Sequence, residues 1–135
     1  DEFQKRLKGI QIDAIAGIES RGFLFGYALA LRMGIPFIPI RKSGKLPWTT
    51  VGIDYALEYG VARIEMHIDA VKPGMKVMIH DDLLATGGTA VAAAQLVQLQ
   101  KASIAGFSFV VELDFLNGRT RLGEYSNEIV SLVRD

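Results

Sequence analysis

The sequence contains no cysteine, which excludes disulfide bonds, thiolate metal sites and a cysteine nucleophile. A chain without cysteine fits a reducing compartment. The sequence also lacks an excess of charge of either sign, because Lys and Arg together number 15 and Asp and Glu together number 15. The net charge therefore indicates neither a nucleic-acid partner nor an acidic membrane surface, and any basic site has to be local.

Long uncharged apolar runs are absent as well, so no segment reads as a membrane-spanning helix. The first residues, DEFQKRLKG, are charged where a signal peptide would be apolar. We therefore expect a cytoplasmic protein. The chain opens on Asp without an initiator Met, which fits a processed protein or a fragment.

The composition is that of a compact protein, since half of the residues are hydrophobic and 22% are charged. At 135 residues, the chain suits a single domain over residues 1–135. Gly and Pro separate short elements, and no internal repeat is visible.

Short apolar runs alternate with helical patterns along this domain. A first helix is closed by Gly9, and two further helices are predicted over 20–34 and from 89 onward. Predicted strands cover 12–18, 35–42, 76–81, 104–113 and 128–135, with an exposed loop over 43–53, a hairpin over 54–68 and an irregular or short helical link before the last strand. Repeated strand, helix, strand order predicts an α/β fold, with a mostly parallel twisted sheet flanked by helices.

The segment HDDLLATGGTA, residues 80–90, interrupts this pattern. Two acids, Asp81 and Asp82, follow an apolar strand, and a loop of small residues then leads into a helix. In parallel sheets, ligands bind at the carboxyl ends of strands, where backbone N–H groups and the positive end of a helix receive anions. The loop is not a Walker motif, because the GxxxxGK[ST] spacing is absent.

A purely structural alternative is that Thr89 caps the helix while the two glycines turn the chain, and a lone Thr-Gly-Gly would favour it. The paired acids favour a ligand, because adjacent carboxylates at the end of a buried strand repel each other and lose hydration unless something compensates them. A sugar phosphate would do so, with its phosphate in the loop and its hydroxyls on the carboxylates. A solvated strand end is the alternative for the acids.

The stretch VMIHDDLLATGGTA resembles the phosphoribosyl pyrophosphate (PRPP) motif of type I phosphoribosyltransferases. Three other segments are similar to the same family in the same order: AGIESRGFLFG (16–26), IRKSGKLP (40–47) and YALEYG (55–60). The form DDLLATGGT resembles the members that use adenine. The resemblance extends along nearly the whole chain and implies the family's fold, with a flexible loop and hairpin over the active site.

The resemblance implies roles for individual residues. Asp81 and Asp82 would hold the ribose hydroxyls of PRPP and stabilise the positive charge that develops as pyrophosphate leaves. Leu83 would contact the adenine ring, with ordinary core packing as its alternative. The 5′-phosphate would be bound by Ala85, Thr86, Gly87, Gly88 and Thr89.

Four residues are implied in pyrophosphate binding: Ser20, Arg21, Arg41 and Lys45. The resemblance also implies a cis peptide at Glu19–Ser20, although the family more often has Asp in place of Glu19. The structural alternative is that Ser20 caps the following helix and leaves Arg21 exposed.

Glu58 resembles the family's catalytic glutamate near the purine N7, where it would act as a general acid or base. Tyr59 would help to order the mobile loop. Mg²⁺ would arrive with the pyrophosphate rather than on protein side chains. The two histidines, His67 and His80, lack ligand spacing and are assigned to no metal.

Taken together, the resemblance implies an enzyme of purine salvage that transfers the phosphoribosyl group of PRPP to adenine, giving AMP and pyrophosphate. It also implies a homodimer, and a further N-terminal segment that covers the purine and is absent from this sequence. Two alternatives stay open: a phosphoribosyltransferase for another nucleobase, and a PRPP-sensing regulator without turnover. Glu58 and the lack of a basic helix-turn-helix segment favour an enzyme over a regulator.

Overall fold

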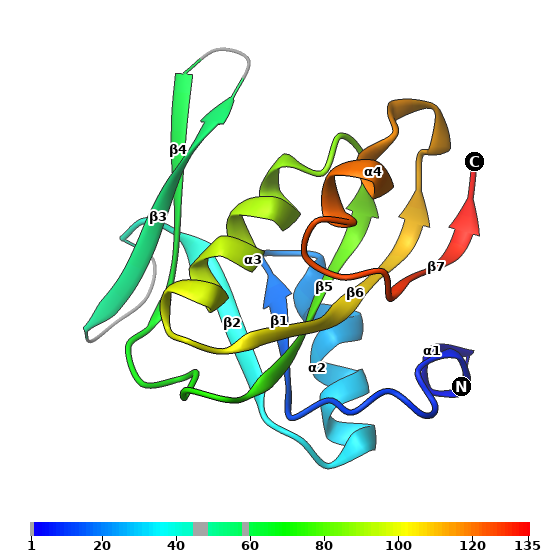
Figure 1. Ribbon diagram of the computed structural model, residues 1–135, viewed down its shortest axis with the longest axis horizontal. Helices are drawn as coiled ribbons and strands as arrows, with labels where there is room; N and C mark the ends of the chain where they lie inside the picture. Colours follow the sequence, from blue (N-terminus) through cyan, green and yellow to red (C-terminus); the bar gives the residue numbers. More distant parts are fainter. Residues whose placement is uncertain (1, 45–48, 58–59) are drawn as a thin grey trace.

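The computed structural model describes residues 2–44, 49–57 and 60–135. Within these ranges the chain forms a seven-stranded sheet in the order β3-β4-β2-β1-β5-β6-β7 (Figure 1). The strands are β1 (Ala14–Ile18), β2 (Phe37–Lys42), β3 (Thr50–Leu57), β4 (Gly60–His67), β5 (Lys76–Leu84), β6 (Ser103–Glu112) and β7 (Ile129–Arg134). The helices are α1 (Glu2–Arg6), α2 (Gly22–Met33), α3 (Gly88–Leu99) and α4 (Gly118–Leu122), with a 3₁₀ turn η1 (Asp114–Leu116).

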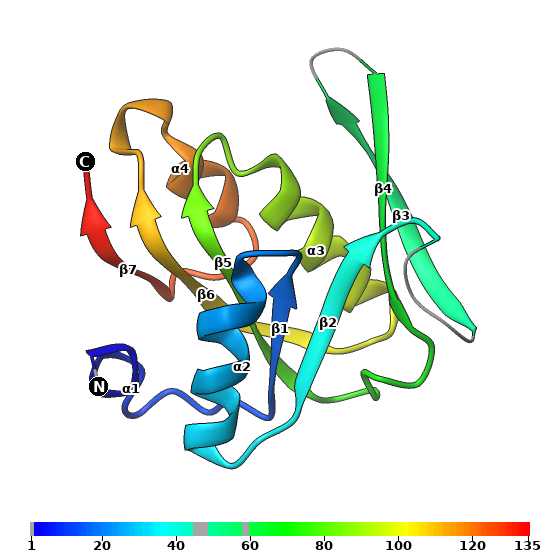
Figure 2. The ribbon, with the colours of Figure 1, turned by 180° about the vertical axis from the view of Figure 1, so that it is seen from behind.

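Five consecutive strands of the sheet are parallel, because β2, β1, β5, β6 and β7 pair in parallel with one another in that order. Strand β4 pairs antiparallel with β2, and β3 pairs antiparallel with β4. The β3–β4 hairpin therefore forms one edge of the sheet and projects beyond the other strands (Figure 2). This arrangement confirms the predicted mostly parallel α/β sheet.

Helices cover both faces of the sheet. Helices α3 and α4 lie on one face, and α1 and α2 lie on the other (Figures 1 and 2). Strand β1 is buried along its whole length, with Ala14, Ala16 and Ile18 in the core on the α3 side and Ile15 in the core on the α2 side. A strand covered on both faces reads as a continuous apolar run, which explains the AIAGI sequence. Among the helices of the described residues, none has the length and apolarity needed to cross a membrane.

The predicted exposed loop over 43–53 is wrong in its second half, because β3 already begins at Thr50. The glycine, the proline and the lack of a periodic pattern in this segment predict a loop, yet Gly52 pairs with Glu65 inside the hairpin. A Cβ atom on Gly52 would lie 2.8 Å from both Arg63 Nη2 and Glu65 Cγ. Gly52 thus makes room for two long side chains of the neighbouring strand, and it does not end the strand.

Candidate functional site

The acid pair lies inside strand β5, which continues to Leu84 and not only to the predicted end at Asp81. The strand continues beyond Asp81 because it pairs with β6, where Asp81 lies opposite Phe109 and Leu83 lies opposite Val111. The acids are therefore at the carboxyl end of a central parallel strand, where ligands bind in such sheets.

Helix α2 approaches the same end of β5 through a glycine. A Cβ atom on Gly22 would lie 3.2 Å from the Cα and Oδ1 atoms of Asp81. Glycine at this position lets the first turn of α2 pack directly against the acid pair.

The two carboxylates have different surroundings. The Asp82 N–H donates a hydrogen bond to Asp81 Oδ1 at 2.7 Å, and Arg21 Nη1 lies 3.5 Å from Asp82 Oδ2. Burial raises the pKa of Asp81 to about 8, and the adjacent Asp82 carboxyl contributes to the rise. The raised pKa favours the protonated form of Asp81 near neutral pH, which reduces the repulsion between the two acids.

His80, the residue before the acids, supplies no positive charge to compensate them. Its side chain is fully buried, its Nδ1 lies 2.9 Å from Ser108 Oγ, and the Phe3 ring packs edge-on against it. Burial lowers the pKa of His80 to about 4, against a smaller opposing effect of Asp82. The imidazole is therefore neutral at physiological pH.

The loop after β5 leads straight into α3, which begins at Gly88. Gly87 is the N-cap residue with φ +91°, a left-handed conformation that favours glycine, and no side chain caps this end of the helix. The alternative in which Thr89 caps α3 is therefore wrong, since Thr89 is already inside the first turn. An uncapped helix end leaves backbone N–H groups available for an anion.

A cavity of about 230 Å³ opens over this loop. Its walls include the loop residues 85–89, the hairpin residue Tyr55, the acid Asp81 and the α4 residue Arg121. Tyr55 and Arg121 were not among the residues assigned from the sequence. No spacing rule connects either one to the loop, because each comes from an element distant in the chain.

A second cavity of about 150 Å³ adjoins the first and shares Tyr55, Asp81 and Thr89 with it. Arg41 lines this cavity, with Nη2 3.3 Å from Glu19 Oε2 and its guanidinium 5.8 Å from the Phe23 ring centroid. The Nε atom of Arg41 is buried and has no hydrogen-bond partner among the described residues. A cation with an unused donor therefore lies beside the acid pair.

A third cavity of about 370 Å³ lies on the other side of the strand end and is largely apolar. Its lining includes Leu24 and Phe25 of α2, Val110 of β6, and Asp82 and Leu83 of β5. Leu83 is 42% exposed and lines both this cavity and the first. The core-packing alternative for Leu83 is therefore wrong.

The turn before α2 contains the implied cis peptide at Glu19–Ser20. Ser20 does not cap the helix, because α2 begins at Gly22 with Arg21 as the N-cap residue and no side-chain cap bond. Ser20 is exposed and lines none of the three cavities. Arg21 lines the apolar cavity through its approach to Asp82.

The structure thus brings most of the sequence-assigned residues together around the end of β5: Asp81, Asp82, Leu83, the loop 85–89, Arg21 and Arg41. The residues Lys45, Glu58 and Tyr59 lie outside the described residues, and their roles stay predictions.

The chain thus has a mostly parallel sheet with a glycine loop and paired acids at the end of a central strand. The family described as "Phosphoribosyl transferase domain" matches residues 2–127. The family match over nearly the whole chain therefore places it in the class of the phosphoribosyltransferases.

Individual relatives show which phosphoribosyltransferases this chain resembles. The adenine phosphoribosyltransferase of Cytophaga hutchinsonii is 55% identical over 128 residues, covering 95% of this chain and 71% of the relative. The crystal structure of the Thermoanaerobacter pseudethanolicus enzyme of the same name has a TM-score of 0.94 and 48% identity, covering 99% of this chain and 77% of that one. The structure of the Saccharomyces cerevisiae enzyme, complexed with adenine and an imino-altritol bisphosphate, has a TM-score of 0.86 and 43% identity. The match covers 97% of this chain and 73% of that one. The chain belongs to the adenine phosphoribosyltransferase family.

The chain spans 71%, 64% and 73% of the length of the first three curated relatives that it matches. Those relatives are therefore longer proteins that share the part described above.

Proposed function

We propose that this protein transfers the phosphoribosyl group of PRPP to adenine, forming AMP and pyrophosphate. The observation that carries the proposal is the meeting of three chemically distinct cavities at the end of β5, around Asp81 and Asp82. The first is lined by residues 85–89, which we call the anion loop, the second by the cationic Arg41, and the third mostly by apolar side chains. PRPP and adenine together present a phosphate, a pyrophosphate and a flat aromatic ring whose faces can pack on apolar side chains.

The first cavity suits the 5′-phosphate, because the uncapped start of α3 and the hydroxyls of Thr86 and Thr89 line it. The second suits the pyrophosphate, since Arg41 lines it and guanidinium groups match phosphate oxygens. The third suits the adenine ring, which Leu83 and Phe25 could contact.

The acid pair would act on the ribose between these cavities. During transfer, the bond from C1′ to pyrophosphate breaks, a bond from adenine N9 to C1′ forms, and the N–H proton of adenine's five-membered ring is lost, while positive charge develops on the ribose. Carboxylates that accept hydrogen bonds from the ribose hydroxyls would stabilise that charge in the transition state. Glu58 is proposed as the general acid or base near N7, on the strength of the sequence resemblance alone.

Mg²⁺ is proposed to enter with the pyrophosphate. This ion prefers phosphate oxygens, waters and carboxylates, and the site offers carboxylates beside the cavity proposed for pyrophosphate. Bound there, Mg²⁺ would supply charge neutralisation to the leaving group. The chain's own contribution is to hold the pyrophosphate with Arg41 and the ribose with the acid pair.

The test supplies the chain with PRPP and Mg²⁺ and with each nucleobase in turn, and measures nucleotide and pyrophosphate. We expect AMP and pyrophosphate in equal amounts with adenine. We expect little product with hypoxanthine, guanine, xanthine or orotate. Product with another base in preference to adenine would identify a different phosphoribosyltransferase. PRPP binding without turnover of any base would favour the regulator. A cytoplasmic location and a homodimer stay predictions from the sequence.

A further inference from the structure

A phosphate group in the first cavity would bring nearly two negative charges to a loop that contains no basic side chain. Residues 85–89 offer backbone N–H groups and two hydroxyls, and Asp81 places a carboxyl group in the same cavity. A cation that adds to these donors would have to come from another element. Among the described residues that line this cavity, Arg121 is the one with a positively charged side chain.

The Arg121 guanidinium already lies against the anion loop. Its Nη1 donates to the carbonyl oxygen of Thr86 at 3.4 Å, and a Cβ atom on Gly88 would lie 3.6 Å from the same nitrogen. A hydrogen bond of this length is weak and can be exchanged for a better acceptor. The side chain thus reaches the start of α3 without being fixed there.

Arg121 also differs from other arginines in having no carboxylate partner. Its side chain is exposed, and no ion pair joins it to an acid within residues 2–44, 49–57 and 60–135. Ion pairs with Asp or Glu hold Arg6, Arg21, Arg41, Arg63, Arg119 and Arg134. The positive charge of Arg121 is therefore available to a ligand.

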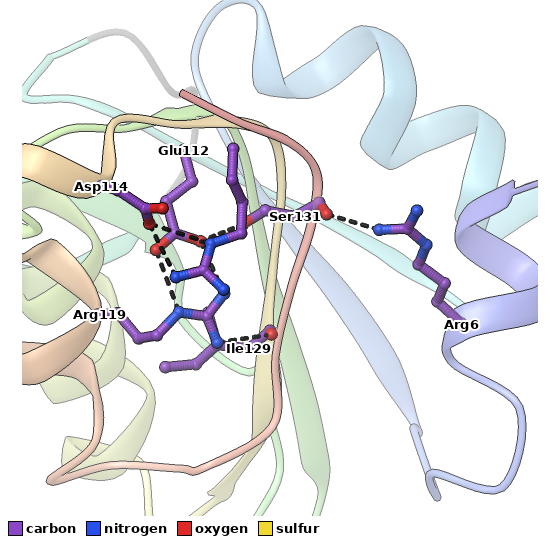
Figure 3. A network of polar contacts seen from close by, with 7 residues as sticks. Arg6, Glu112, Asp114, Arg119, Ile129 and Ser131 are labelled. Carbon is purple, nitrogen blue, oxygen red and sulfur yellow. Dashed lines mark hydrogen bonds and ion pairs between the residues drawn. The ribbon is translucent and has the colours of Figure 1, made fainter.

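The helix that carries Arg121 is anchored by its neighbour Arg119 (Figure 3). Nη2 and Nε of Arg119 donate to the two carboxylate oxygens of Glu112 at 2.7 and 3.0 Å, and Nη1 donates to the Ile129 carbonyl at 3.1 Å. Glu112 is only 2% exposed. Residues two apart point to different sides of a helix, so the anchoring of Arg119 on β6 and β7 leaves Arg121 free to face the loop.

Glycines bring α4 and the loop into close contact. A Cβ atom on Gly118 would lie 2.5 Å from the Ala85 carbonyl oxygen, and one on Gly87 would lie 3.1 Å from the Gly118 carbonyl oxygen. The first residue of α4 therefore packs on the backbone of the loop 85–89, and this packing fixes the backbone that carries Arg121 beside the loop.

We propose that Arg121 is a phosphate-binding residue, whose guanidinium leaves the Thr86 carbonyl and pairs with the 5′-phosphate of PRPP or AMP. This inference rests on the proposed function and adds to it a substrate contact from outside the PRPP motif. Arg121 touches the 5′-phosphate and no reacting atom. Its loss should therefore weaken binding of every ligand with that phosphate and spare binding of the pyrophosphate.

The experiment measures dissociation constants by calorimetry for AMP and for pyrophosphate with Mg²⁺. It compares the unaltered chain with Arg121→Ala, Arg121→Lys and the control Lys72→Ala, which removes an exposed positive charge in the turn before β5. Arg121→Ala should weaken AMP binding about ten- to a hundredfold, the range for a hydrogen bond to a charged group. Pyrophosphate binding should stay the same, Arg121→Lys should recover part of the loss, and Lys72→Ala should change neither ligand.

The assignment would be overturned if Arg121→Ala weakened the binding of AMP and of pyrophosphate equally, or if it bound AMP as tightly as the unaltered chain. Either result would leave the proposed function intact. An unaltered chain that bound neither AMP nor pyrophosphate would refute the proposed function and the Arg121 assignment together. Thermal unfolding of each variant without ligand checks that the fold is kept, and Arg121→Lys provides the folded comparison if the alanine variant unfolds.

Discussion

Nη1 of Arg21 lies 3.5 Å from Oδ2 of Asp82, which joins the turn before α2 to the end of β5. The Arg21 side chain is 82% exposed in this pair. Exposed ion pairs contribute less than about 1 kcal/mol to stability, because water screens the charges and the side chains lose freedom. Arg21 is therefore placed where it can leave Asp82 for an anionic ligand at little expense to the fold.

The change Arg21→Ala should leave the thermal unfolding temperature within about 2 °C of the unaltered chain, since the lost ion pair is exposed. The family resemblance implies that Arg21 turns from Asp82 and the apolar cavity toward the pyrophosphate, so affinity for PRPP should fall about ten- to a hundredfold when this charge-assisted hydrogen bond is lost. Calorimetry with PRPP and Mg²⁺ measures the effect, and Arg21→Lys is the control that keeps the charge. A clear drop in unfolding temperature with unchanged PRPP affinity would mean that Arg21 has a structural role.

The second prediction concerns Asp81, whose pKa is raised from an ordinary value near 3.8 to about 8. The folded chain binds this proton more tightly than the unfolded chain. The protonated Asp81 carboxyl therefore stabilises the fold fully below about pH 4, and this stabilisation is lost as the pH rises toward 8. Asn cannot ionise, so Asp81→Asn should be more stable than the unaltered ligand-free chain by about 0.5–2 kcal/mol at pH 8. The difference should shrink toward pH 4 in denaturant titrations.

The same variant should lose PRPP turnover, and Asp81→Asn with Asp82→Asn should abolish it while the fold persists. The control is Asp69→Asn, a change at an exposed acid away from the cavities described above. A stability difference that did not vary between pH 4 and 8 would contradict the raised pKa of Asp81. Unaltered kinetics in the double variant would contradict the central role of the acid pair.

The sequence predicted the sheet and its helices because the apolar runs and their Gly and Pro boundaries are local signals. It also located the PRPP motif, whose residues are contiguous. The boundaries that were wrong depend on neighbours far along the chain. Gly52 belongs to a strand because of Arg63 and Glu65 on β4, and β5 continues past Asp81 because β6 pairs with it.

Two residues of the site are not assigned from the sequence for the same reason, although Tyr55 opens the YALEYG segment. Tyr55 and Arg121 reach the first cavity from the hairpin and from α4, and only the folded sheet brings these elements to one place. The third cavity likewise combines α2, β5 and β6. A motif can specify the loop that receives a phosphate, whereas the residues that surround the loop follow from the tertiary structure.

The third prediction tests the buried acid that anchors α4. Burial alone would raise the pKa of Glu112, but hydrogen bonds from Arg119 and Ser131 and the positive charges of Arg119 and Arg134 outweigh it and hold the pKa below its ordinary value near 4.5. Glu112→Gln should destabilise the chain by about 3 kcal/mol at pH 7, because Arg119 loses its charged partner. Denaturant unfolding measures this loss.

The pH dependence of that loss follows from the lowered pKa of Glu112. Its stabilising effect is present above the unfolded value near 4.5 and disappears as the pH falls through the folded value, so the difference between the two chains should narrow below about pH 4. Glu124→Gln, at an exposed position beyond α4, is the control and should change stability by less than about 0.5 kcal/mol. Similar stabilities for both variants at pH 7 would argue against the anchoring role of Glu112.

The last prediction uses two glycines five residues apart at either end of α4. A Cβ atom on Gly118 would lie 2.5 Å from the Ala85 carbonyl oxygen and 2.8 Å from Leu84 Cδ1, so backbone has to move. On Gly123, with φ −59°, the nearest atom would be the Thr120 carbonyl oxygen at 3.4 Å, an ordinary contact. Gly118→Ala should therefore destabilise the chain by about 1–3 kcal/mol and weaken AMP binding, because α4 is pushed off the anion loop.

Gly123→Ala should be neutral or stabilising by up to about 1 kcal/mol, with AMP binding unchanged. Denaturant unfolding and AMP calorimetry on both variants give the comparison, and equal behaviour of the two would mean that the packing of Gly118 on Ala85 does not shape the phosphate site.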